Sequence, residues 1–215
     1  MPSHGTDLLG TRYAIDFIAV DEHRRTSPQH SWRTVLGTEP ADIFVGFDRP
    51  VLAPVSGVVA AVHDGEPDHV ARRSQLTLLP YVLRQRERLR QGVGAIAGNH
   101  VCIEVAGTTA YVGLVHLRRG TIEVQVGQHV TEGQLIARCG NSGNSTQPHV
   151  HVQAMDSMDL RIAKGVPVVF RDFREWPAGR RGSIRSRIRG PIRRTLAVPG
   201  EESVVEAVFE VAASG

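Results

Sequence analysis

The chain has 215 residues, of which 41% are hydrophobic and 5% aromatic, and its formal net charge is +3. This length and composition suffice for one large domain or a domain with appendages, and they exclude wholesale disorder. The low aromatic content favours short strands and tight turns over helix bundles. No segment approaches the roughly 20 consecutive apolar residues of a membrane-spanning helix. Residues 1–10 lack a basic stretch followed by an apolar one, so no signal peptide is predicted, and we expect a cytosolic protein if Met1 is the true start.

The first predicted strand, residues 13–20, is apolar except for Asp16. A carboxylate inside such a run is costly unless it is hydrogen-bonded or bound to a metal ion. Two interpretations of Asp16 are therefore open, a hydrogen-bonded structural residue and a metal ligand. The polar segment that follows, residues 21–42, is predicted to form a long surface loop.

Two short strands flanking a Pro-Val-Ser-Gly turn are predicted within residues 50–63. A helix is predicted at residues 76–90, where leucines and arginines recur with helical spacing and Pro80 marks the start. We expect this helix to belong to an insertion, near residues 66–98, that packs on the sheet.

Strands joined by a Gly-Thr-Thr turn are predicted at residues 100–105 and 110–117. Two Gly-Gln turns then bracket short alternating strands within residues 124–138. The two cysteines, Cys102 and Cys139, have no metal-ligand spacing, and we interpret them as small apolar core residues. A bridge between neighbouring strands is the alternative.

The most informative stretch is residues 140–153, which read Gly-Asn-Ser-Gly-Asn-Ser-Thr-Gln-Pro-His-Val-His-Val-Gln. Its first part is a turn-rich loop, and its second part is a short strand that begins at His149. Because side chains alternate along a strand, His149, His151 and Gln153 share one face, while valines anchor the other. Neutral imidazoles are common metal ligands and proton shuttles near neutral pH. The alternative is a chance His-X-His on a solvated edge strand.

The C-terminal part of the chain contains two further predicted strands, residues 166–170 and 203–212, with a basic segment between them. This segment, residues 171–194, holds nine arginines and two acidic residues. Two acids cannot neutralise nine arginines, so we expect a surface segment that recruits an anionic polymer or a membrane surface. The alternative is a solvated hairpin whose charges pair with the acidic remainder of the chain. No specific nucleic-acid partner is predicted.

Several separated features together resemble the M23 (LytM or lysostaphin-type) zinc peptidases. They are Asp16 in an early strand, His116 at a strand end in Val-His-Leu, the Pro-His-Val-His loop with His149 and His151, and the segments Val-Leu-Ala-Pro-Val-Ser-Gly-Val-Val and Val-Gly-Gln-His-Val-Thr-Glu-Gly-Gln-Leu-Ile. The resemblance covers residues 4–170, interrupted by the insertion.

The resemblance implies a mainly β fold, a compact antiparallel β-sheet or sandwich with a groove, of the duplicated hybrid motif type, with one inserted helix. It also implies zinc-dependent hydrolysis of peptide cross-links, with a peptide or bacterial cell-wall peptidoglycan as the substrate. We therefore expect an M23-like peptidase domain in residues 1–170. Residues 171–215, the basic segment and the last strand, are expected to pack on the same domain.

Carried over to this sequence, the resemblance assigns Asp16 and His151 as zinc ligands and His116 and His149 as catalytic residues. A catalytic zinc ion takes three protein ligands and keeps one position open for water. The metal lowers the pKa of that water and polarises the scissile carbonyl. One of the two catalytic histidines would take the proton of the water, and the other would stabilise the oxyanion or protonate the leaving amine.

One position departs from the family pattern. The family usually has a histidine ligand four residues before the aspartate, and this chain has Arg12 there. A guanidinium group has no lone pair to offer a metal ion, so we expect Arg12 to turn away from the metal. We therefore predict His4, in Ser-His-Gly-Thr, as the third ligand, and its alternative is a frayed terminal residue. The weaker candidates are Asp7, His23 and His30.

Two other functions stay open at the level of sequence. Arg12 favours a degenerate relative that has lost its metal ion and serves as a binding or activating module. A phosphocarrier-type domain is the second alternative, because sugar-transport IIA domains share this kind of β architecture and use a histidine pair. Asp16 and the Pro-His-Val-His loop favour zinc over both, and the metal content of the purified protein discriminates among the three.

Overall fold

The computed structural model describes residues 8–28, 34, 36–72, 74, 93–178 and 190–208. The chain divides into two compact units, Met1–Val166 and Pro167–Gly215. Among the described residues, no helix is long and apolar enough to cross a membrane.

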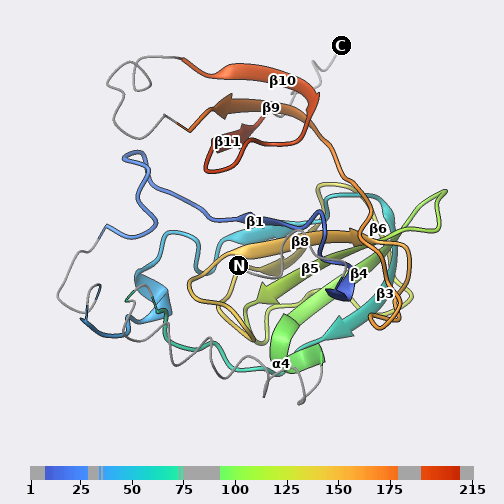
Figure 1. Cartoon of the computed structure of the whole chain (residues 1–215). Helices are drawn as coiled ribbons and strands as arrows, with labels where there is room; N and C mark the ends of the chain where they lie inside the picture. The colour runs from blue at the N-terminus through green and yellow to red at the C-terminus, as the bar shows by residue number, and fades with distance from the viewer. Residues whose placement is uncertain are drawn as a thin grey trace, which may run out of the picture. The chain divides into compact units, whose positions relative to one another are not determined.

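A six-stranded sheet forms the centre of the first unit (Figure 1). Its strands are β1 (Ile15–Phe17), β3 (Gly57–His63), β4 (Asn99–Val105), β5 (Tyr111–Leu117), β6 (His129–Val130) and β8 (Val150–Met155). Their order is β1-β8-β5-β4-β3-β6, and every neighbouring pair is antiparallel. A two-stranded antiparallel sheet joins β2 (Pro50–Leu52) to β7 (Leu135–Arg138). The predicted mainly β, antiparallel fold is confirmed.

The described helices are short. Two are single 3-10 turns, Leu8–Gly10 and Ala41–Ile43, and the third is the α-helix α4 (Val93–Ala97), directly before β4. The predicted helix at residues 76–90 lies outside the described residues.

Alternation along the central strands separates a core face from a functional face. Val101, Leu114 and Val152 oppose one another on β4, β5 and β8, and their side chains are almost completely buried. Residues one position along each strand point the opposite way, because side chains alternate across a sheet. His151 on β8 therefore faces away from this core, and it lies opposite Asp16 on β1.

Both cysteines are buried free thiols, which confirms their interpretation as core residues. Burial raises the pKa of Cys102 to about 11 and that of Cys139 to about 12. Neither thiol is therefore poised for nucleophilic chemistry near neutral pH.

The second unit contains a three-stranded antiparallel sheet of β9 (Phe170–Trp176), β10 (Ile192–Ala197) and β11 (Val204–Ala207), in the order β10-β9-β11. The strand predicted at residues 166–170 is wrong, because regular pairing begins at Phe170. Pro167 has no N–H to donate to a strand ladder, which explains the later start. Strand β11 falls within the strand predicted at residues 203–212.

The basic segment, residues 171–194, contributes arginines to this sheet that have acidic partners. Arg194 on β10 donates from Nε to Oε2 of Glu175 at 2.7 Å, and this glutamate is only 3% exposed. Arg174 lies 3.4 Å from Glu206 on β11. The middle of the segment, residues 179–189, lies outside the described residues.

Candidate active site

Antiparallel pairing of β1 with β8 brings Asp16 and His151 together. The two residues are direct cross-strand partners, so their side chains point to the same face. Nδ1 of His151 lies 2.8 Å from Oδ1 of Asp16. Nε2 of His149 lies 3.6 Å from the same carboxylate oxygen. Residues that are 135 positions apart in the chain thus form one cluster.

His116 reaches this cluster through a β-bulge near the end of β5. Residues 99–101 on β4 oppose residues 114–117 on β5, so β5 has one residue more than its partner. His116 has a φ of 65°, a left-handed conformation that is uncommon outside glycine. In a regular strand His116 would share the core face with Leu114, two residues earlier. The extra residue redirects the side chain, as bulges beside active sites often do.

The bulge places the His116 ring beside the two histidines of β8 and its preceding loop. The ring centroids of His116 and His149 are 4.8 Å apart, and those of His116 and His151 are 6.1 Å apart. The three residues are 6%, 4% and 8% exposed, respectively. The structure therefore brings together four of the five residues that the sequence analysis proposed for the site.

Backbone carbonyls of the loop at residues 140–148 bind Nδ1 of both catalytic candidates. Nδ1 of His116 lies 2.9 Å from the carbonyl oxygen of Ser142, and Nδ1 of His149 lies 2.7 Å from that of Gln147. A carbonyl oxygen only accepts hydrogen bonds, so Nδ1 carries the proton in both rings. In the neutral form, each ring then has its lone pair on Nε2.

Burial also sets the charge of His116. Desolvation lowers the pKa of His116 well below its usual 6.5, and the neighbouring His149 and His151 act in the same direction. A charged imidazole is unfavourable away from water and beside other imidazoles. His116 is therefore a neutral ring near pH 7, and its Nε2 can accept a proton.

The donor atoms of Asp16 and His151 fit a zinc ion. The side-chain amide of Gln153 donates to the carbonyl of Leu9 at 3.1 Å, which turns its Oε1 towards Nε2 of His151 at 3.1 Å. Nδ1 of His151 faces the Asp16 carboxylate and Nε2 faces Oε1 of Gln153, so a zinc ion bound by Asp16 and Nδ1 would leave the Nε2–H to donate to Gln153. Carboxylate oxygen and imidazole nitrogen are usual zinc ligands, and a metal-bound histidine normally donates its other N–H in this way.

The predicted third ligand, His4, lies outside the described residues, as do Asp7 and His30. In the part of the chain that the structure describes, no group of three His, Cys, Asp or Glu residues is placed to hold a metal ion. The alternative candidate His23 is exposed, and its Nε2 lies 3.4 Å from Oε1 of Glu22.

Arg12, at the position where the family pattern has a ligand, is exposed in the turn before β1. Its backbone nitrogen and Cβ pack against Gly165, whose missing side chain would lie 3.0 Å from that Cβ. The prediction that Arg12 turns away from a metal ion stays a prediction.

Three contributors to the site were missed by the reasoning from sequence. Gln153 had a signal, because it follows His151 by two residues and therefore shares its face. Ser142 and Gln147 act through their carbonyl oxygens, and a backbone role leaves no trace in the side-chain pattern. The bulge at His116 is also invisible in Val-Gly-Leu-Val-His-Leu, which reads as an ordinary apolar strand.

Residues 83–168 match the family model of Peptidase family M23. The matched segment contains His116, His149 and His151, and it begins after Asp16. It covers less than half of the chain, and the resemblance to M23 peptidases is confirmed there.

Solved structures with similarity to this chain include the following three proteins. The catalytic domain of the antimicrobial peptidase lysostaphin from Staphylococcus simulans is 19% identical, with a TM-score of 0.37 over 65% of this chain and 84% of that chain. The catalytic domain of the prophage-encoded M23 protein EnpA from Enterococcus faecalis is 20% identical, with a TM-score of 0.37 over 66% and 94%. A zinc-containing peptidase from Vibrio cholerae is 21% identical, with a TM-score of 0.34 over 63% and 34%. The site assignment rests on the residues of this chain.

Proposed function

Given that residues 83–168 match peptidase family M23, we propose that this chain is a zinc-dependent endopeptidase. Its substrate would be the peptide bonds of bacterial cell-wall peptidoglycan or a related peptide. The observation that carries the proposal is the convergence, on one sheet face, of the Asp16–His151 pair with two buried histidines held in one tautomer.

In this proposal Asp16 and His151 hold the zinc ion, and His4 completes the set of protein ligands. Bound zinc would supply a water of lowered pKa and polarise the scissile carbonyl. Gln153 orients His151 by accepting its Nε2–H.

His116 and His149 move protons in the proposed reaction. In its neutral form each ring has its lone pair on Nε2, so one of them would take the proton of the attacking water at that atom. The imidazolium formed there can return the proton to the leaving amine. The other ring would stabilise the developing oxyanion through an Nε2–H, with that proton taken up from solvent before the substrate binds. Their low exposure keeps bulk water from competing for these protons.

Metal analysis and hydrolysis assays on the full chain test the proposal. Wild-type protein purified in zinc-replete buffer should hold about one zinc ion per chain, and Asp16→Ala and His151→Ala should lose most of it. His63→Ala is the matched control, since this half-buried histidine lies outside the site. Chelated wild type should stop releasing amino groups from purified peptidoglycan and recover when zinc is restored.

A second candidate function is favoured by Arg12, which replaces a usual ligand of the family. A degenerate module of this kind would bind peptidoglycan without cleaving it. Wild-type protein that stays free of zinc under replete conditions, but still sediments with peptidoglycan, would establish this binding function and overturn the endopeptidase proposal.

A further inference from the structure

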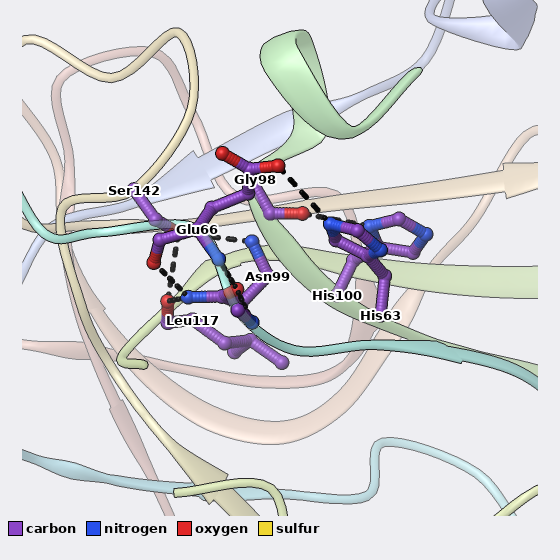
Figure 2. Close-up of polar contacts among 8 residues, drawn as sticks. His63, Glu66, Gly98, Asn99, His100, Leu117 and Ser142 are labelled. Atoms are coloured by element: carbon purple, nitrogen blue, oxygen red, sulfur yellow. Dashed lines mark hydrogen bonds and ion pairs between the residues drawn. The ribbon is translucent and has the colours of Figure 1, made fainter. Parts of the chain in front are cut away.

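Three chain segments meet beside Ser142, whose carbonyl oxygen lies 2.9 Å from Nδ1 of His116. They are the irregular segment at residues 64–68, the junction of α4 with β4, and the loop at residues 140–148. Two polar residues with 0% exposure, Asn99 and Ser142, lie at this junction (Figure 2). Polar side chains buried to this degree are costly unless their hydrogen bonds are satisfied, so their partners define the geometry.

Asn99 uses both ends of its side-chain amide. Oδ1 accepts from the backbone N–H groups of Gly65 and Glu66, both at 2.8 Å. Nδ2 donates to the carbonyl oxygens of Glu66 at 2.8 Å and Leu117 at 3.1 Å. These four bonds fix the amide in one orientation between residues 65–66 and the end of β5, and Figure 2 shows Asn99 beside its partners Glu66 and Leu117.

The Ser142 hydroxyl continues this network into the loop. It accepts from the backbone N–H of Asn99 at 3.0 Å and donates to the carbonyl of Leu117 at 2.8 Å. The carbonyl of the same serine accepts the Nδ1–H of His116 at 2.9 Å. The side chain of Ser142 is therefore tied to β4 and β5, while its main chain holds the catalytic ring.

Close backbone contact leaves the loop little freedom to shift. Gly98 and Gly143 have φ values of 63° and 67°. A Cβ on Gly98 would lie 2.4 Å from Oγ of Ser142, and a Cβ on Gly143 would lie 2.3 Å from the backbone nitrogen of Gly98. Glycine at both positions lets the two backbones touch at this point.

We propose that Asn99 and the Ser142 hydroxyl are positioning residues that hold the Ser142 carbonyl on Nδ1 of His116. They thereby keep the proton on Nδ1 and the lone pair on Nε2, where the reaction needs it. The catalytic consequence rests on the proposed endopeptidase function, whereas the effect on the His116 tautomer does not. A purely structural role would lower stability without changing that tautomer.

The test compares Ser142→Ala with Thr121→Val in the full chain. Thr121 is a matched control, because its hydroxyl also donates to a carbonyl, that of Arg118 at 2.8 Å, and accepts a backbone N–H, that of Arg138 at 3.2 Å. Neither bond of Thr121 leads to a site histidine. Asn99→Asp is a second test variant, since it keeps acceptors for the N–H groups of residues 65–66 and removes the donor to Leu117.

Nitrogen-15 NMR of the histidine rings supplies the readout that is independent of activity. In wild type and Thr121→Val, His116 should be the Nδ1–H tautomer alone, and in Ser142→Ala and Asn99→Asp a second tautomer should appear. On a soluble cross-linked peptidoglycan fragment, kcat should fall about 10- to 100-fold in these two variants with KM nearly unchanged. An unchanged His116 spectrum in folded Ser142→Ala and Asn99→Asp would overturn the proposal. The expected tautomer change in a chain whose wild type hydrolyses nothing would instead retain the positioning role and reject the endopeptidase function.

Discussion

The left-handed backbone at His116 predicts that the usual stability order of glycine and alanine variants is reversed at this position. At most strand positions glycine is less stable than alanine by about 0.5–1 kcal/mol, because it loses more backbone entropy on folding. At φ of 65° the Cβ of an L-residue crowds the following carbonyl, and only glycine avoids this strain. We therefore expect His116→Gly to be more stable than His116→Ala.

The magnitude follows from the difference between the two variants. Both remove the imidazole and leave the Ser142 carbonyl without its donor, so these large losses cancel in the comparison. The left-handed strain of about 1–2 kcal/mol exceeds the entropic disadvantage of glycine, which leaves glycine favoured by about 1 kcal/mol. For a chain of this size, such a difference shifts Tm by about 2–4 °C.

The assay is equilibrium urea unfolding followed by NMR signals from β4 and β5, which report on the first unit. Val115→Gly and Val115→Ala form the matched control, because Val115 precedes His116 on the same strand and has no left-handed backbone. At position 115 alanine should be the more stable variant. If alanine were also the more stable residue at position 116, the bulge would not have the geometry that places His116 in the site.

Three further outcomes are expected. His116→Ala and His149→Ala should each keep zinc but lose hydrolysis by about 10²- to 10⁴-fold, the usual contribution of an acid–base group, and zinc loss in either would show that ligand and catalyst are interchanged. His4→Ala should lose zinc while Arg12→Ala keeps it, and full zinc retention in His4→Ala would transfer the third-ligand role to another residue. Binding of the full chain to anionic polymer or anionic vesicles through residues 171–194 should weaken as salt rises, and binding that is insensitive to salt would refute electrostatic recruitment.

Part of the site could be predicted because simple periodicity governs it. Alternation along residues 149–153 places the two histidines on one face of the strand. A carboxylate inside an apolar strand is costly unless a hydrogen-bond donor or a metal ion binds it. The structure supplies that partner through the pairing of Asp16 with His151. Sequence alone predicts which residues share a strand face, because strand geometry fixes the side-chain direction from one residue to the next.

The placement of His116 depends on strand pairing, which no local sequence pattern encodes. Regular alternation would have put His116 with the core residue Leu114, and only the register of β5 against β4 reveals the extra residue. The late start of β9 has a local cause in Pro167, although the other residues of the strand predicted at 166–170, three valines and Phe170, have high β propensity. Cross-strand register and competing backbone constraints overrode the local preference in both places.

The loop at residues 140–148 is held by described residues near the two ends of the predicted insertion. This loop supplies both carbonyls that hold the catalytic candidates, so its position controls two rings at once. The described ends of the insertion, near residues 66–98, bind the loop from both sides through hydrogen bonds of Asn141 with Asp68 and His69, of Thr146 with Arg72, and of Asn144 with Ile96. Residues 68–72 and Ile96 therefore brace the loop that supplies both carbonyls. Substitutions among residues 68–72 and at Ile96 are therefore expected to act on the proposed reaction through the placement of His116 and His149.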